Sequence, residues 1–419
     1  MQRTQTKILA CAGRLLLEYN ESTGAIERTL AVTAQRLTDE HLDVAITYGG
    51  IVVTLGDDPP LRMPVRELRY NATLQARVHQ ILSDVRAGKL GPDEALAQLE
   101  RAEIDAPAHS RWTAVALLGI AASSLAVLLG ADFGGVIVAG VGSGLGLLGR
   151  QELGRRHFNL LILPLTAAFI GAALGGLAIR FGWTETPALV LIVPSLMLIP
   201  GPHLINGLLD LVENYLPMSI ARLGLASGIL VAAALGIVLG IELTLSAPPI
   251  AEQIAKTAHL NLLSDMLLAG VVTCGFAVYY NVAWPHIGMA VLGGMAGHGL
   301  RFLALEAGWS LETATFLGGL TVGLVSALIA RSYKIPVAVI AFAGAVTMMP
   351  GMQIYRALGG MLRLAQSKNT AELPTIAGTL GEASQACLVV TALALGLIVA
   401  ARTVLVLTTD QSIPSNWKR

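Results

Sequence analysis

Ten apolar runs follow one another between residues 112 and 409, and they constrain the fold more than any other feature. Most are close to the ~20 residues that a helix needs to cross a bilayer. Because each crossing must satisfy its own backbone polar groups in lipid, we interpret the runs as helices. Gly and Ala are frequent in them, which is typical of closely packed membrane helices. The runs begin near Trp112, Ala131, Phe158, Thr186, Ser219, His259, Pro285, Ser310, Ile335 and Gly378.

Charge is concentrated before the first of these runs. Residues 1–111 hold 13 of the 28 Lys and Arg and 15 of the 28 Asp and Glu, although only 13% of the whole chain is charged. The sequence therefore predicts a soluble domain over residues 1–110 and two five-span units over residues 111–245 and 255–409. Membrane lipid is an implied partner, whereas a net charge of zero gives no electrostatic footprint for nucleic acid.

The soluble segment mixes strand and helix patterns. Strand-type runs over 42–48 and 51–55 flank Gly49-Gly50, which is typical of a two-residue hairpin. No apolar run of signal-peptide type follows the first residues, so we expect a small cytoplasmic α+β domain with a regulatory or docking role. A third strand is expected over 63–68, and helices are expected over 4–19, 25–37, 71–89 and from Gly91 onward.

Two of the apolar runs stop early at a Pro-Gly pair, Pro200-Gly201 in one half and Pro350-Gly351 in the other. Each run covers only about fifteen residues before the pair, which is short for a crossing. Proline lacks the backbone donor and glycine disfavours a helix, so we expect both helices to break there. Interrupted hydrophobic segments at matching places in two halves point to the binding site of a transporter.

The two halves also correspond outside these pairs. When the chain is shifted by 151, residues 119–150 fall on residues 270–301 without a gap, and Arg150 falls on Arg301. With five spans each, the second unit must enter the membrane from the other side, which predicts inverted repeats. Ten basic residues on the predicted cytoplasmic side against six outside agree with an N-terminus in the cytoplasm. The clearest cytoplasmic groups are Arg150, Arg155, Arg156, Arg331 and Lys334.

A helix that begins after each break has unpaired N–H groups and a positive dipole end, which suit an anion such as a substrate carboxylate. We expect side chains just past the breaks to complete the pocket, with Arg356 pairing bidentately with the carboxylate. The alternative is that both Pro-Gly pairs end a helix at the membrane surface. The predicted substrate-binding residues are Pro200, Gly201, His203, Asn206, Asp210, Pro350, Gly351, Gln353, Tyr355 and Arg356.

Ionisable groups within spans are costly and usually functional. Asp265 and Glu382 lie near the start of their spans, and we predict that one of them carries a coupling proton; the alternative is a place at the membrane interface. Ser384 and Gln385 are candidate cavity-lining residues. Asn281 is another, although it equally fits an aromatic belt.

Several classes of function lack their sequence signatures. No Gly-x4-Gly-Lys-Ser/Thr pattern supports ATP-driven transport, and no His-Glu-x-x-His or Gly-x-Ser-x-Gly pattern supports a hydrolase. Cys11, Cys274 and Cys387 are far apart. We interpret His286 and His298 as packing residues with satisfied hydrogen bonds; the alternative is a proton relay. We therefore expect no enzymatic activity, no cofactor and no metal.

Three stretches carry a resemblance to a known family. They are Gly24-Ala-Ile-Glu-Arg28, Ile199-Pro-Gly-Pro-x-x-x-Asn-Gly-x-x-Asp210 and Met349-Pro-Gly-x-x-x-Tyr-Arg356. Through them the chain resembles the threonine/serine exporter family over nearly its whole length. The resemblance implies ten spans after a cytoplasmic domain, and export of threonine and serine driven by the proton motive force. Related proteins split over two chains are associated with export of dicarboxylates such as succinate.

We therefore expect a multi-pass secondary transporter of the cell (inner) membrane that exports a small carboxylate-bearing solute by proton-coupled alternating access. Threonine and serine are the first expectation, and a dicarboxylate is the alternative. Arg356 and His203 would suit a second carboxylate, whereas Asp210 or Asp265 would suit an ammonium group. A receptor or scaffold without transport is the alternative of another class. A monomer and a homo-oligomer both stay open.

Overall fold

A computed structural model describes residues 2–106, 108–244, 260–333, 335–367 and 372–408. Some predicted features fall outside the described residues. They are the connection over 245–255, the span start near His259, Lys334 and the chain end at 409.

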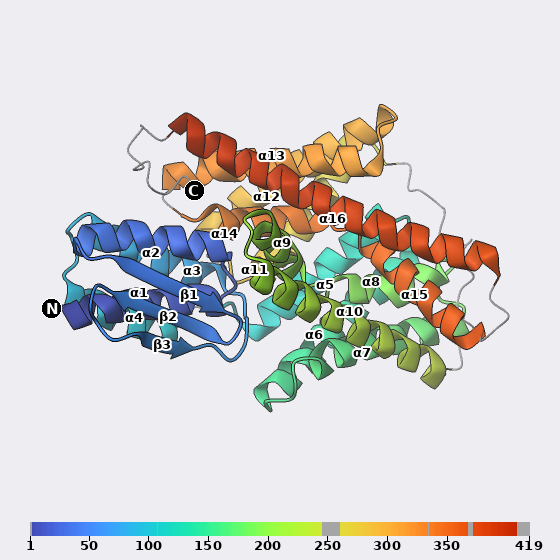
Figure 1. The fold of residues 1–419 in the computed structure, drawn as a ribbon. Helices are drawn as coiled ribbons and strands as arrows, with labels where there is room; N and C mark the ends of the chain where they lie inside the picture. Colours follow the sequence, from blue (N-terminus) through green and yellow to red (C-terminus); the bar gives the residue numbers. More distant parts are fainter. Residues whose placement is uncertain (1, 107, 245–259, 334, 368–371, 409–419) are drawn as a thin grey trace.

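The N-terminal domain (residues 2–106) combines one sheet with four helices (Figure 1). Its elements are α1 (Gln2–Glu18), α2 (Thr23–Leu37), β1 (Leu42–Thr47), β2 (Gly50–Leu55), β3 (Leu61–Pro64), α3 (Ala72–Arg86) and α4 (Pro92–Ile104). The strands pair antiparallel in the order β1-β2-β3. Thr47 lies opposite Gly50, so the hairpin turn is Tyr48-Gly49, one residue before the predicted Gly49-Gly50. Gly50 has φ +147°, and a Cβ there would lie 2.4 Å from the carbonyl oxygen of Met63. That position therefore needs glycine.

The core of this domain forms because α1 packs between β2 on one side and α3 and α4 on the other. Ile8, Ile51, Leu82 and Leu99 are each fully buried in one cluster. Met218, from the membrane part, belongs to the same cluster. The domain therefore packs directly against the membrane helices.

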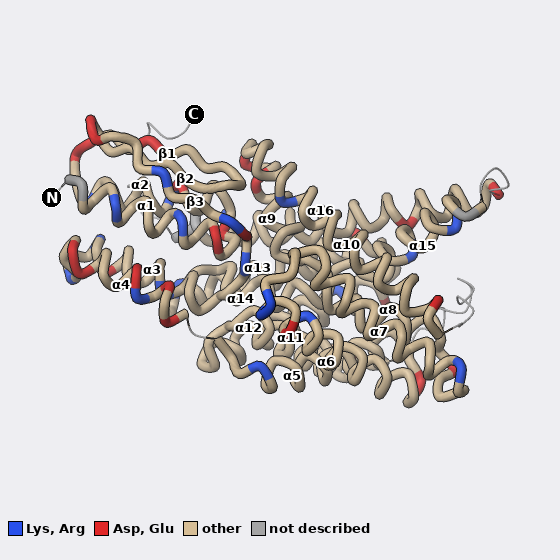
Figure 2. Tube along the Cα trace, turned by 90° about the horizontal axis from the view of Figure 1, so that it is seen from below, with Lys and Arg blue, Asp and Glu red and all other residues tan. Residues whose placement is uncertain are grey.

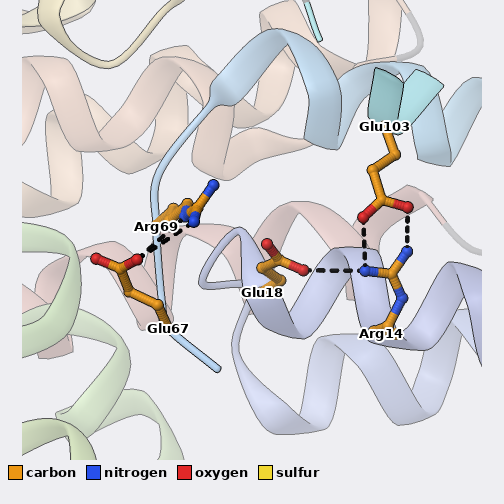
Figure 3. A network of polar contacts seen from close by, with 5 residues as sticks. All are labelled: Arg14, Glu18, Glu67, Arg69 and Glu103. Atoms are coloured by element: carbon orange, nitrogen blue, oxygen red, sulfur yellow. Dashed lines mark hydrogen bonds and ion pairs between the residues drawn. The ribbon is translucent and has the colours of Figure 1, made fainter. Parts of the chain in front are cut away.

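Ion pairs hold α4 on α1 at the edge of this core (Figure 3). The Arg14 guanidinium donates to both carboxylate oxygens of Glu103, with 2.9 Å from Nη1 to Oε1, and also to Glu18 one turn along α1. A bidentate pair of this kind fixes geometry as well as contributing energy. Arg69 makes a separate pair with Glu67 in the segment that leads to α3.

The membrane part is helical throughout its described residues. The first unit holds α5 (Arg111–Leu128), α6 (Phe133–Arg155), α7 (Ile162–Arg180), α8 (Pro187–Leu196), α9 (Gly201–Val212) and α10 (Leu216–Thr244). The second unit holds α11 (Leu262–Tyr279), α12 (Trp284–Glu306), α13 (Leu311–Tyr333), α14 (Val337–Ala345), the short 3-10 helix η2 (Val346–Met348), α15 (Gly351–Ser367) and α16 (Leu373–Thr408).

Among the described helices, eight are long and apolar enough to cross a membrane. Two bent pairs raise the number to ten if each pair is one span: α8 with α9, bent by 62°, and α14 and η2 with α15, bent by 57°. These are the helices of an all-α polytopic membrane protein. The last span begins at Leu373, five residues before the expected Gly378, because the helix extends beyond its apolar run.

The same packing pattern occurs in both units. In the first, α6 packs between α5 and α7, and α7 packs on α10; in the second, α12 packs between α11 and α13, and α13 packs on α16. Figure 1 shows α13 and α16 side by side across the molecule. Glycines permit the close contacts, as expected: a Cβ on Gly171 of α7 would lie 2.5 Å from Cβ of Pro194 in α8.

The N-terminal domain marks one side of the helix bundle, here called the domain side. The backbone N–H of His109, two residues before α5, donates to the side chain of Asn281, two residues after α11 (2.9 Å). Helix α5 therefore starts where α11 ends. The opposite side, where α5 ends and α11 starts, is called the far side. Charged residues gather on the N-terminal domain and are sparse along the helices (Figure 2).

Candidate functional site

The two breaks meet each other inside the bundle. A Cβ on Gly201 would lie 3.1 Å from Val346 and 3.5 Å from Met349, and a Cβ on Gly351 would lie 2.6 Å from Ile199. Pro200, Gly201, Pro350 and Gly351 are all buried. The Tyr355 hydroxyl donates to the carbonyl of Ser195 (3.0 Å) and so ties α15 to α8. Neither Pro-Gly pair ends a helix in open solvent.

A cavity of about 330 Å³ lies where the breaks meet. Leu196 and Ile199 line it from the first break, and Pro350, Gly351 and Gln353 line it from the second. Its wall extends to the far-side ends of α5, α11, α12 and α13, and most of it is apolar. The polar lining residues are Asp265, His298, Arg301, Thr347 and Gln353.

Asp265 and His298 form a buried pair in this cavity. Asp265 lies in the first turn of α11 and is only 6% exposed. Nδ1 of His298, on α12, lies 2.6 Å from Oδ2 of Asp265. His298 is therefore a hydrogen-bonded histidine whose ring nitrogen holds the carboxyl group of Asp265. A carboxyl–imidazole pair at this distance can hold or pass a proton.

Arg301 and the start of α15 supply positive potential to the same cavity. Nε of Arg301 donates to the Thr315 hydroxyl (3.2 Å), and no carboxylate of the described residues forms an ion pair with Arg301. Gly351 and Gln353, in the first turn of α15, line the cavity, so the positive end of that helix faces it. A guanidinium and a helix N-terminus together suit a carboxylate.

Asn206 and Asp210 lie outside the cavity, because α9 carries them toward the N-terminal domain. Asp210 is nine residues past the first break, or roughly 13 Å along a helix. Its Oδ1 accepts from the backbone N–H of Thr23 (2.8 Å), and its Oδ2 lies 3.1 Å from Nε of Arg222. The Asn206 amide donates to the carbonyl of Asn20. These side chains bind the α1–α2 turn.

The N-terminal motif lies in the same interface. Arg28 pairs with Glu213 (3.0 Å), and Glu27 accepts from the Tyr215 hydroxyl (2.6 Å). A Cβ on Gly24 would lie 1.8 Å from the Glu213 carboxylate, so a larger residue there would displace that side chain. The motif therefore joins α2 to the α9–α10 turn.

Arg356 and Glu382 bind each other, with 3.3 Å from Nη1 to Oε1, rather than lining the cavity. Arg356 is five residues past its break, or roughly 8 Å along α15, where α16 is the neighbour. Ser384 is exposed, and neither it nor Gln385 lines the cavity.

Asn281 lies in the α11–α12 turn against the N-terminal domain, with φ +54°. Besides its bond to His109, its carbonyl accepts from the backbone N–H and the hydroxyl of Thr73 (3.1 and 2.6 Å). His203 lies on α9, and its Nδ1 is buried with no partner among the described residues. Neither residue lines the cavity.

Comparisons with known proteins agree with this architecture. Residues 7–244 match the family model described as "Putative threonine/serine exporter", and residues 265–402 match the one described as "Threonine/Serine exporter, ThrE". The chain belongs to the threonine/serine exporter family. It is thus a multi-pass membrane transporter of a small-molecule substrate, not an enzyme.

Two relatives show how far the similarity extends. The "Threonine/serine exporter" of Corynebacterium glutamicum is 25% identical over 395 residues, which are 90% of this chain and 79% of the relative. The "Probable succinate transporter subunit YjjP" of Klebsiella aerogenes is 23% identical over 248 residues, which are 58% of this chain and 95% of the relative. No solved structure matches the chain.

Sequence reasoning missed three of the five polar cavity residues, His298, Arg301 and Thr347. Arg301 entered only as the repeat mate of Arg150, His298 only as a packing residue, and Thr347 not at all. One signal was available. Asp265, His298 and Arg301 are the ionisable groups that face one another across α11 and α12, and His298 and Arg301 are three residues apart on one helix face.

Proposed function

We propose that this transporter exports a small amino acid, threonine or serine, through alternating access of the cavity between its two breaks. The observation that carries the proposal is the grouping of Arg301, Asp265 and His298 in a cavity that both broken spans line. Binding between two interrupted helices near the middle of the bundle is how many secondary transporters hold their solute.

The charges of the cavity favour an amino acid over a dicarboxylate. Arg301 and the start of α15 would hold the α-carboxylate, and Asp265 would hold the ammonium group. Thr347 and Gln353 would hydrogen-bond the side-chain hydroxyl. A dicarboxylate would place its second carboxylate beside Asp265, where only a protonated His298 could balance it.

The Asp265–His298 pair is the candidate for proton coupling. A carboxyl group that binds the ammonium of the solute must be ionised, so a proton on the pair and a bound amino acid compete for one place. Competition of this kind couples the two fluxes in opposite directions. Glu382, the other candidate, is already paired with Arg356 outside the cavity.

The helix order supports inverted repeats and an N-terminus in the cytoplasm. Because α5 begins and α11 ends on the domain side, the two units run in opposite directions, and their packing pattern is the same. Three basic residues lie at the C-terminal end of α6, which is on the domain side: Arg150, Arg155 and Arg156. Basic residues are enriched on the cytoplasmic side of membrane proteins. We infer that this side faces the cytoplasm across the inner membrane.

The test is counterflow in proteoliposomes with labelled threonine, serine and succinate at several pH gradients. We expect exchange of threonine or serine, and a loss of about tenfold or more in flux for Arg301→Gln, as removal of a charged hydrogen bond predicts. Asp265→Asn is expected to lose the dependence on the pH gradient while inserting normally. The control is Arg180→Gln, at an exposed arginine that ends α7 on the far side.

Two results would contradict the proposal. Transport of succinate in preference to both amino acids would reject the assignment of the substrate. Undiminished, gradient-dependent flux in Asp265→Asn would reject the coupling role of the pair.

A further inference from the structure

We propose that a second solute site lies on the domain side, formed by Arg150, His203 and Tyr280, and that it takes the carboxylate-bearing solute when the bundle opens toward the N-terminal domain. The inference rests on the proposed function, because it names the place from which the exported solute is taken up. In the present structure aromatic rings fill this site.

Each of these three residues has a counterpart that lines the far-side cavity. Arg150 on α6 corresponds to Arg301 on α12 at the shift of 151. His203, two residues past the first Pro-Gly pair, corresponds to Gln353, two residues past the second. Tyr280 at the end of α11 corresponds to Leu129 at the end of α5, and Leu129 lines the far-side cavity. These three positions therefore match between the units, whereas Asp265 and His298 correspond to the apolar Ala114 and Leu147.

Two polar atoms of this group are buried without partners. The Tyr280 hydroxyl has none among the described residues, although Tyr280 is only 4% exposed. It lies beside the first break, where a Cβ on Gly201 would come within 3.6 Å of the hydroxyl oxygen. Nδ1 of His203, in the first turn of α9, is likewise unpaired among the described residues. Unpaired buried polar groups cost free energy, which a polar solute between them would recover.

Arg150 supplies the positive charge. Its guanidinium lies 5.8 Å from the ring centroid of Tyr279, and no carboxylate of the described residues forms an ion pair with it. A cation over an aromatic face is a weak arrangement compared with a cation on a carboxylate. Arg150 is therefore held beside the bundle by an aromatic ring and is available to an anionic group.

Packed rings close this site in the present structure. Tyr280 packs on Tyr279 at 5.4 Å and on Phe276 at 5.8 Å between ring centroids. Tyr70 of the N-terminal domain covers Tyr280 from outside, with ring centroids 4.9 Å apart. Burial raises the pKa of Tyr70 well above its usual value, and its neutral hydroxyl donates to the carbonyl of Ala338 in α14 (3.3 Å). The far-side cavity is thus formed while its counterpart is closed.

The test measures the Michaelis constant separately from each side. Counterflow of labelled threonine is measured in right-side-out and inside-out membrane vesicles, whose orientation is assigned by protease access to the N-terminal domain. We expect Arg150→Gln to raise KM from the domain side by about tenfold or more, as loss of a charged hydrogen bond predicts, and to change KM from the far side less than about twofold. Arg301→Gln is expected to do the reverse.

Two further variants keep the test decisive. Tyr280→Phe retains the ring and removes an unpaired hydroxyl, so it is expected to fold and to raise KM only from the domain side. Arg155→Gln, at an exposed arginine of α6 one turn beyond Arg150, is expected to leave both values unchanged.

The outcomes separate this site from the proposed function. If wild-type vesicles move none of the solutes, the proposed function fails. If Arg301→Gln impairs transport while Arg150→Gln and Tyr280→Phe leave KM from the domain side unchanged, or change both sides equally, only the second site is overturned. If Arg150→Gln fails to insert, the KM of Tyr280→Phe from the domain side decides whether the second site exists.

Discussion

Arg222 is the largest fully buried side chain of the described residues, and it lies where α10 meets the N-terminal domain. Besides Asp210, it reaches the side-chain oxygen of Asn20 (2.9 Å) and the carbonyl of Glu21. A buried pair adds little net stability, but removal of one partner leaves an unpaired buried charge. We therefore expect Arg222→Met to destabilise the fold by about 3–5 kcal/mol.

The measurement is thermal unfolding in detergent of Arg222→Met, Asp210→Asn and the double variant. The double variant is expected to recover much of the loss, because it removes both charges. Arg28→Gln serves as the control, since its pair with Glu213 is half exposed and contributes at most about 1 kcal/mol. Additive losses in the double variant would contradict a direct coupling of the two charges.

The residue scale also shows what the sequence could and could not predict. The position of Asp265 in the cavity was predictable, because an ionisable group inside an apolar span is costly and usually faces a polar interior. Arg356, Glu382 and Asp210 satisfied the same criterion, yet the structure gives them protein partners outside the cavity. Whether a buried charge binds solute or protein depends on which residue packs against it in the fold. That residue cannot be identified from a single sequence.

At the scale of elements, the breaks were predictable and their meeting was not. Pro-Gly at the end of a short apolar run indicates a bend through local chemistry alone, and both bends are present. The contact of Gly351 with Leu196 and Ile199 joins positions some 150 residues apart. It depends on the packing of two units that run in opposite directions.

Substitution of Gly351 tests that contact. A Cβ there would lie 2.6 Å from Ile199 and 2.7 Å from Leu196, so Gly351→Val is expected to force the breaks apart at a cost of about 1–3 kcal/mol. The flux in proteoliposomes should fall roughly tenfold. Gly359→Val on the same helix is the matched control, because a Cβ there meets nothing within 4 Å. Equal losses in both variants would assign the effect to helix propensity instead.

At the scale of the whole molecule, the N-terminal domain bridges both units on the domain side. Its α1–α2 turn and α2 bind α9 and α10 of the first unit through polar contacts. Tyr70 and the start of α3 bind the second unit through the rings of Tyr280 and Phe342 and the α11–α12 turn. The sequence predicted a domain with a regulatory or docking role. Nothing in the sequence of this domain indicated that it binds both units at once.

Exposure to water would affect the polar contact with the first unit and the aromatic contact with the second unit differently. Water can solvate the Asp210–Arg222 pair and so offset the cost of separating it, whereas exposure of the Tyr70–Tyr280–Phe342 rings is only unfavourable. We therefore expect the domain to release the first unit and keep the second when the domain side opens. Backbone amides report on this directly, since Thr23 N–H bonds to Asp210, while Ala72 and Thr73 N–H bond to the α11–α12 turn.

Amide hydrogen exchange with and without saturating threonine measures the difference. Exchange should accelerate in the peptide that contains Thr23 and stay nearly constant in the peptide that contains Ala72 and Thr73, because local opening sets the rate. The peptide from β2 is the internal control, as its amides lie in the core of the domain. Faster exchange at Ala72 and Thr73 alone would mean that the domain follows the first unit. Parallel acceleration at both contacts would mean that it detaches as a whole.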